Sequence, residues 1–385
     1  MDIVYLDNAA TTKVAPEVLE AMLPFLTDHF GNPSSFHSFG SSEMDSIEKA
    51  RGQVARLLGA KCEEIYFTSG GTESDNQAIR GAVRINPERT GIVTSSVEHP
   101  AVLETARALE NEGLSFEMAE VTEIGELDLE SLKTLVNEKT AIVSIMAANN
   151  ETGVVMPIKE AAEIAHKAGA LFHTDAVQMV GKSPIHVHSL GIDMLSLSAH
   201  KLHGPKGVGA IFIKKGINLP PMVTGGHQEK GIRSGTYNVP GIVGLGKAAE
   251  LALTHIDGSS VEERKLREYF EERVIEGCPG AFVVAQKAEF RLPGTVTFIF
   301  EGIESEAILT LMDMQGIYAS SGSACSTGSK NPSHVLYAMK IDYTLANSAL
   351  RFSLSRYTTK EEIDRAVEVL VIVTDRLRKI SPYIN

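Results

Sequence analysis

The sequence predicts an α/β protein with two domains, a large one built on a mostly parallel sheet and a smaller α+β one. With 385 residues, the chain is longer than the roughly 100 to 200 residues of a usual single domain. Between residues 65 and 213, short apolar runs alternate with helical patterns, as in a parallel sheet covered by helices. A long polar loop at 225–236 precedes a second group of helices and strands. We therefore expect the large domain at 16–258 and the small domain at 1–15 and 259–385.

The segment before the sheet is predicted to contain an extended polar arm and two helices. A helical pattern from Pro16 places these residues on one face: Val18, Leu19, Met22, Leu23 and Leu26. Residues 30–40 collect Gly, Asn, Pro and Ser around His37, a composition that forms turns and often lines a site. A second helix is expected at 47–58.

Apolar runs and the turn residues between them give the remaining elements. In the large domain we expect strands at 65–68, 92–96, 141–146, 171–174, 192–197 and 209–213. Helices are expected at 72–83, 100–110 and 158–167, with Pro100 at a first helical position. Toward the C-terminus we expect helices at 242–253, 261–274, 304–315 and 361–379 and strands at 294–300 and 318–319.

Composition argues against several functional classes. Hydrophobic residues make up 43% and charged residues 22% of the chain, as in an ordinary globular protein. A net charge of −13 with no basic stripe argues against a nucleic-acid or acidic-membrane partner. No apolar run approaches a membrane span and the start lacks a signal-peptide core, so we expect a cytoplasmic protein. Three cysteines without a CxxC pair argue against a disulfide framework and a structural zinc site, and we expect no metal.

Lys201 is the candidate around which the site is organised. It follows the apolar run 192–197 and precedes Gly204, Pro205, Gly207 and Gly209, which hold it on a stiff turn. In such a seat, loss of hydration and nearby cations lower a lysine pKa, and a neutral amine can form a Schiff base with an aldehyde such as pyridoxal phosphate (PLP). The alternative is a surface lysine, which the flanking Ser198 and His200 argue against without excluding it.

Polar residues follow three further predicted strands. His99 follows one strand, Asn150 lies after a second, and Asp175 and Gln178 follow a third. Because ligands bind at the carboxyl ends of strands in open α/β sheets, these groups are expected to converge with Lys201. Taken singly, an aspartate after a strand is more often a helix cap, and a histidine more often an ordinary hydrogen-bonding residue.

The segment from Ser69 to Glu73, SGGTE, joins a strand to a helix and allows two interpretations. Gly70 and Gly71 let the backbone approach an anion, and the N–H groups at the start of the helix point toward it, which predicts a phosphate cradle. Thr72, with Asp75 nearby, is equally typical of a helix cap. The segment is neither a Walker A loop nor a dinucleotide fingerprint, so no nucleotide is implied.

The chain supplies each group that PLP requires. Lys201 is the amine, Asp175 the carboxylate for the pyridine nitrogen, Gln178 the donor to the phenolic oxygen and His99 the stacking group. Phosphate ligands are expected from Gly71, Thr72, Ser198 and His200.

Two further side chains complete the candidate chemistry. Cys325 lies in SSGSACSTGS, residues 320–329, a run so rich in small residues that we expect a mobile loop carrying an exposed thiol. Cys62 and Cys278 lie beside predicted helix ends and are expected to be inert. Arg351 is the candidate for holding a carboxylate with two hydrogen bonds, its alternative being a surface arginine.

Ten ordered motifs together resemble one family. The motifs are LDNAATT, GNPSSFHSFG, FTSGGTESDN, VEHPAV, NNETG, HTDAVQ, SLSAHKLHGPKG, RSGTYNVP, SSGSACSTGS and LRFSLSRYTT, and the resemblance runs from Tyr5 to about Tyr383. The chain resembles the PLP-dependent cysteine desulfurases of the class V aminotransferases, which have fold type I, and is most similar to the nitrogen-fixation and iron–sulfur-cluster branch. SGGTES and HKLHGPKG fit both the nitrogen-fixation and the housekeeping enzymes, so the sulfur-accepting scaffold protein stays open.

The resemblance implies a role for each matching residue. Lys201 would hold PLP, with His99, Asp175, Gln178, Thr72, Ser198 and His200 in the roles given above. Thr236 would reach the phosphate in a neighbouring subunit, which implies a homodimer. Asn150 and Arg351 would hold the carboxylate of L-cysteine, with Asn32 lining the pocket. Cys325 would take the sulfur as a persulfide and leave L-alanine. A selenocysteine lyase, an ordinary aminotransferase and a non-enzymatic sulfur carrier remain the alternatives.

Overall fold

A seven-stranded mixed sheet forms the centre of the N-terminal two thirds of the chain. The computed structural model describes residues 3–321 and 333–381. The strand order is β2-β8-β7-β6-β5-β3-β4, and these strands are Ile65–Thr68 (β2), Gly91–Ser95 (β3), Ser115–Ala119 (β4), Thr140–Ser144 (β5), Leu171–Asp175 (β6), Met194–Ser198 (β7) and Gly209–Ile213 (β8). The pairs from β7 to β4 are parallel, whereas β8 runs antiparallel to both β7 and β2. The prediction of a mostly parallel sheet is confirmed.

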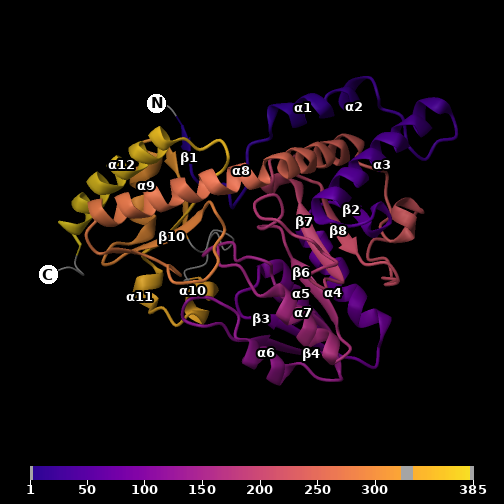
Figure 1. Ribbon diagram of the computed structural model, residues 1–385, viewed down its shortest axis with the longest axis horizontal. Helices are drawn as coiled ribbons and strands as arrows, with labels where there is room; N and C mark the ends of the chain where they lie inside the picture. The colour runs from indigo at the N-terminus through magenta and orange to yellow at the C-terminus, as the bar shows by residue number, and fades with distance from the viewer. Residues whose placement is uncertain (1–2, 322–332, 382–385) are drawn as a thin grey trace.

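Helices cover both faces of this sheet (Figure 1). Neighbouring strand residues alternate between two cores, as Ile92 and Val93 or Ile211 and Phe212 do, because successive side chains of a strand point to opposite faces. On one face pack α4 (Gly71–Ile85) and α5 (Pro100–Asn111). On the other pack α3 (Ser38–Leu58), α6 (Leu129–Leu135), α7 (Ile158–Lys167) and the first half of α8 (Val239–Gly277).

A second sheet with its own apolar cluster lies toward the C-terminus. Its strand order is β12-β13-β10-β9, with bounds Ser320–Ser321 (β12), Ala349–Ser353 (β13), Thr295–Phe300 (β10) and Ala281–Val283 (β9). The cluster adds Val4 and Leu6 from the N-terminal arm, because β1 (Val4–Tyr5) pairs with β11 (Ile317–Tyr318). The helices here are α9 (Ser305–Asp313), α10 (His334–Ala338), α11 (Tyr343–Ala346) and α12 (Lys360–Arg378). The boundaries 1–15, 16–258 and 259–385 stay a prediction.

The long helix α8 corrects one expectation. We expected separate helices at 242–253 and 261–274, but the structure has a single helix of 39 residues, which runs along both sheets in Figure 1. Gly258, Ser259 and Ser260 are weak helix formers, and they predict that one helix ends and another begins here. In the structure the helix is unbroken, and Ser259 Oγ donates to His255 O at 2.8 Å within it. Packing against α3, α1 and α12 outweighs the weak local propensity.

The N-terminal helices correct a second expectation. The helical pattern from Pro16 forms two short helices, α1 (Pro16–Met22) and α2 (Pro24–Thr27), because Pro24 interrupts it. Val18 is buried, but Leu19, Leu23 and Leu26 are exposed by about half. Helix α3 begins at Ser38 instead of residue 47, since His37 caps it through Nδ1, which accepts from Gly40 N. Short 3₁₀ turns lie at Cys62–Glu64 (η1), Ala199–Lys201 (η2) and Gln228–Gly231 (η3).

No helix within residues 3–321 and 333–381 is both long and apolar enough to cross a membrane.

Candidate active site

Nine predicted site residues line one pocket at the carboxyl ends of the parallel strands. We call it the strand-end pocket; its predicted lining residues are Gly71, Thr72, His99, Asn150, Asp175, Gln178, Ser198, His200 and Lys201. They come from the ends of β3, β5, β6 and β7 and from the start of α4. The pocket has a volume of about 230 Å³ and is partly open to solvent.

Lys201 lies at the end of the turn η2, directly after β7. Its Nζ donates to the backbone oxygens of Ala9 at 2.5 Å and Ala10 at 2.8 Å, so the N-terminal arm holds the amine. The turn requires Gly204, because a Cβ there would lie 2.9 Å from Ala199 O. The turn η2 and the N-terminal arm therefore fix the position of Lys201 Nζ at the pocket.

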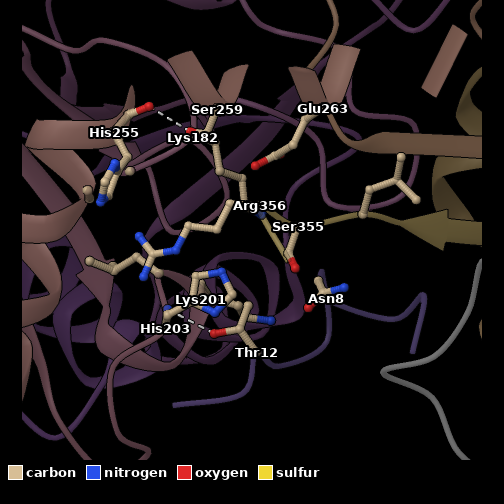
Figure 2. Close-up of a pocket in the computed structure, with 14 residues that line it drawn as sticks. Asn8, Thr12, Lys182, Lys201, His203, His255, Ser259, Glu263, Ser355 and Arg356 are labelled. Carbon is tan, nitrogen blue, oxygen red and sulfur yellow. Dashed lines mark hydrogen bonds between the residues drawn. The ribbon is translucent and has the colours of Figure 1, made fainter. Parts of the chain in front are cut away.

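A second space lies on the other side of Lys201. This rear cavity is lined by Lys201 together with Asn8, Thr12, Lys182, Glu263 and Arg356, among others. Figure 2 shows Glu263 and Ser259 entering from α8, with Thr12 and Asn8 on the opposite side. Lys201 is thus the boundary between the strand-end pocket and the rear cavity.

Asp175 supplies a buried carboxylate to the strand-end pocket. It is 6% exposed, and its Oδ1 accepts from Val177 N at 2.9 Å. Burial raises the pKa of Asp175, whereas the nearby His99 and Lys201 act in the opposite direction. The arrangement suits a carboxylate that shares a proton with a ring nitrogen.

Asp75 is a second buried carboxyl in the same pocket, although its place in the sequence indicates only a part in a helix cap. Asp75 is 1% exposed, and its Oδ1 lies 3.6 Å from His173 Nε2. Burial, and then the nearby Asp175, raise the pKa of Asp75 well above its usual value. Because two buried carboxylates cannot both carry charge at low cost, the negative charge is concentrated on Asp175.

His99 is neutral and its tautomer is set by the backbone. It caps α5, with Nδ1 accepting from Ala101 N at 3.1 Å. Burial lowers the pKa of His99, and a neutral ring whose Nδ1 accepts carries its proton on Nε2. The ring is therefore a flat uncharged group with a fixed donor.

The start of α4 forms an anion cradle. The cap residue is Gly70, at φ 158°, and no side chain caps the helix, so the expectation of a cap made by Thr72 is wrong. A Cβ on Gly71 would lie 2.7 Å from Val177 Cγ2, so only glycine lets the backbone come this close. The first-turn N–H groups of a helix lack partners within it and attract anions.

Ser198 and His200 extend this cradle from the neighbouring strand. Burial, followed by the charge of Lys201, lowers the pKa of His200 to about 4, so its ring is neutral at pH 7. His200 Nδ1 lies 3.2 Å from Thr11 Oγ1. A neutral imidazole, two hydroxyl groups and backbone N–H groups are donors suited to a phosphate.

PLP, which the resemblance implies, fits these residues. The amine of Lys201 is surrounded by a buried carboxylate, the amide of Gln178 and a flat neutral ring. An anion cradle, which a Cβ at residue 71 would obstruct, lies in the same pocket. Within residues 3–321 and 333–381, no three His, Cys, Asp or Glu side chains gather into a set that could hold a metal ion.

Three predicted residues do not line the strand-end pocket. Arg351 is 2% exposed, and it donates to Asn150 O at 3.0 Å and to Asp7 Oδ1 at 2.8 Å. Asn32 and Thr236 are exposed and do not line the strand-end pocket within one chain. Cys325 lies outside the described residues. Cys62 is exposed and Cys278 is buried, and burial raises the pKa of the Cys278 thiol.

Comparison with known proteins agrees with the site. Residues 4–366 match the family model "Aminotransferase class-V". A cysteine desulfurase from Trichormus azollae is 50% identical over 385 residues, covering 100% of this chain and 96% of its own.

Solved structures give the same result. A structure described as a NifS-like protein superposes with a TM-score of 0.92 at 39% identity, covering 98% of this chain and 100% of its own. A structure described as SspA in complex with cysteine gives a TM-score of 0.82 at 35% identity, covering 92% of this chain and 99% of its own. The chain therefore belongs to the cysteine desulfurases, a PLP-dependent group within the class V aminotransferases.

Proposed function

We propose that this protein takes sulfur from L-cysteine, releases L-alanine and carries the sulfur as a persulfide on Cys325 for iron–sulfur cluster assembly. The Cβ–S bond of the substrate breaks and an S–S bond to Cys325 forms, so one thiol becomes a persulfide and no external oxidant is needed. PLP supplies an electron sink for the substrate. The observation that carries the proposal is the convergence of eight polar and glycine residues on one pocket beside Lys201.

The residues of the strand-end pocket have distinct roles in this proposal. Lys201 holds the cofactor and moves a proton, and His99 covers the cofactor ring. Asp175 and Gln178 contact the pyridine nitrogen and the phenolic oxygen. The start of α4 binds the phosphate together with Ser198 and His200. Support comes from the burial of Asp175, the neutral state of both histidines and the space at Gly71.

Arg351 and Asn150 are proposed to hold the carboxylate of L-cysteine, with Asn32 nearby. Arg351 Nε is buried and has no hydrogen-bond partner within the described part of the chain. A guanidinium with an unused donor favours a carboxylate. The solved neighbour described as a complex with cysteine supports the choice of substrate.

The role of Cys325 is supported by the residues that flank its segment. On one side, Ser320 pairs with Arg351 in the second sheet. On the other, Ser333 Oγ donates to Glu151 Oε2 at 2.5 Å, next to Asn150. The segment that carries the thiol therefore starts and ends beside the proposed carboxylate site.

A homodimer is supported by exposed apolar side chains between α1 and the first turn of α3. They are Leu19, Leu23, Leu26, Phe30, Phe36 and Phe39, with Phe30 at 74% and Phe36 fully exposed. Apolar groups gathered in this way are typical of a protein interface. Thr236 is exposed too, as required of a residue that contacts the phosphate in a partner subunit. We also propose the cytoplasmic location that is expected from the sequence.

The test uses purified protein reconstituted with PLP, whose absorbance is recorded before and after addition of L-cysteine. Alanine and, in the presence of a reducing thiol, sulfide are measured, and light scattering gives the mass. Cys325→Ala is expected to keep the visible absorption and lose sulfide release, whereas Cys62→Ala, the matched exposed cysteine, keeps both. Full turnover by Cys325→Ala, or a colourless wild-type protein, contradicts the proposal.

A further inference from the structure

Lys182 contacts the back of the strand-end pocket without lining it. Its Nζ donates to Gln178 Oε1 at 3.1 Å, and its side chain borders the rear cavity with Glu263 and Arg356 (Figure 2). Gln178 is 6% exposed and lines the strand-end pocket. Gln178 therefore separates Lys182 from the space that the cofactor occupies.

An ammonium group determines which way the amide of Gln178 faces. Lysine in its charged form has three donors and no acceptor, so only the amide oxygen of Gln178 can face it. The NH₂ group must then point away from Lys182, and one of its hydrogens is donated to Ala9 O at 2.9 Å. The second hydrogen is the donor that remains for a ligand.

The surroundings keep Lys182 in place and charged. Ser260 Oγ, from α8, donates to the backbone oxygen of Lys182 at 2.7 Å. Loss of hydration, with Lys201 next, lowers the pKa of Lys182 to about 8, while Glu263 favours the charged form and Arg351 opposes it. Since this value lies above 7, the ammonium form predominates at neutral pH.

We propose that Lys182 is a positioning residue, which fixes the side-chain amide of Gln178 so that its NH₂ group faces the phenolic oxygen of PLP as a donor. The inference rests on the proposed function, because it takes Gln178 as the partner of that oxygen. Without Lys182, only the hydrogen bond from Gln178 Nε2 to Ala9 O holds this orientation, so the amide presents its NH₂ group to the cofactor for a smaller fraction of the time. For the rest of the time, both the lost donor and the oxygen–oxygen repulsion disfavour negative charge on the phenolic oxygen.

The experiment follows the visible absorption of the bound cofactor as a function of pH. Lys182→Met removes the donor and is expected to raise the pH midpoint by about 0.5 to 1 unit, the size of one hydrogen bond expressed as a pKa change. Lys182→Gln keeps a neutral donor and is expected to restore most of the wild-type midpoint. Lys215→Met, at a lysine whose side chain is 71% exposed, serves as the control and is expected to leave the midpoint unchanged.

A double-mutant comparison tests whether Lys182 acts through Gln178. In a Gln178→Ala background, Lys182→Met is expected to cause no further shift. Equal shifts in both backgrounds, or no shift in either, overturn the inference. Lys182→Met combined with Glu263→Gln removes the ammonium group together with the carboxyl group that favours it, and provides a second variant if the single one does not fold. A colourless wild-type protein would instead overturn the proposed function, and the inference with it.

Discussion

The strand-end pocket and the rear cavity share Lys201 but are built from different parts of the chain. The pocket is formed by residues 71–201, all at strand ends of the first sheet or at the start of α4. The rear cavity joins the N-terminal arm, α8 and the residues after β13. The pocket thus depends on one sheet, whereas the cavity depends on how distant segments pack. The residues proposed to carry out the chemistry are therefore positioned by one sheet, whereas the residues behind them are brought together by tertiary packing.

The largest effect is expected where the two spaces meet. Lys201→Ala removes the amine that borders both, so the visible absorption of the cofactor should disappear and turnover should fall at least about 1,000-fold, in the upper range for loss of an acid–base group. Absorbance and alanine formation are the measurements. Lys215→Ala, at an exposed lysine, should leave both unchanged. A coloured Lys201→Ala variant would contradict the role given to this lysine.

A change confined to the strand-end pocket should separate binding from catalysis. Asp175→Asn keeps the shape of the side chain but loses its charge, so the cofactor should stay bound while kcat falls about 100-fold, as for loss of one electrostatic contact in a catalytic site. Cofactor content and kcat are measured on the same sample. Asp45→Asn, at an exposed position, is the control. An unchanged kcat would remove Asp175 from the mechanism.

The anion cradle can be tested by its shape alone. Gly71→Ala places a Cβ 2.7 Å from Val177 Cγ2, so either the helix start or the Val177 side chain must shift, and the Kd for PLP should rise about tenfold, equivalent to about 1.4 kcal/mol. Shortening the neighbour in Gly71→Ala with Val177→Ala should restore most of the affinity. Titration of the apoprotein with PLP gives both values. If the double variant binds as weakly as the single one, the contact with Val177 is not the cause.

The smallest effect is expected in the rear cavity. Burial raises the pKa of Glu263 from 4.5 to about 7, so between these values the folded protein keeps a proton that the unfolded chain releases. This carboxyl therefore destabilises the fold as pH rises from about 4.5 to 7. Glu263→Gln should make the decrease of Tm between pH 5 and pH 7 smaller by about 2 °C. The effect is small because one such group contributes little to the stability of a chain of this size.

Thermal unfolding at pH 5 and pH 7 measures the difference. Glu262→Gln, one residue earlier on α8 with a side chain 68% exposed, should follow the wild-type protein at both pH values. Equal slopes for Glu263→Gln and wild type would show that the rear cavity carries no titrating carboxyl in this range.

The same contrast explains what the sequence could predict. His99, Asp175 and Lys201 each lie at the end of an apolar strand or within a few residues of it, so a parallel sheet brings them to one edge whatever the details of packing. Lys182, Glu263 and Arg356 carry no such signal, because they meet only when α8 and the segment after β13 pack beside the arm. Asp75 is part of the motif FTSGGTESDN. Only its burial in the structure distinguishes a carboxyl group of the pocket from one that caps a helix.

Missed elements have equally local causes. The strand β4 lies at the edge of the sheet and is mostly exposed, so its residues lack the apolar run that predicts a buried strand. The helix α6 did leave a signal, since Asp128 caps it by accepting from the N–H groups of Glu130 and Ser131. The exposed leucines of α1 and α2 are typical of an interface. The helical spacing of apolar residues does not show whether such a face packs in the core of one chain or against another chain.

The unbroken helix α8 has a mechanical consequence. At about 1.5 Å per residue, its 39 residues form a rod roughly 58 Å long that packs on both sheets. A helix with intact hydrogen bonds does not bend sharply at its middle. A relative rotation of the two sheets must therefore occur where α8 packs against them, and not at Gly258. Any load on the far end is then transmitted along the rod past Glu263, one helical turn after the serine that holds the backbone of Lys182.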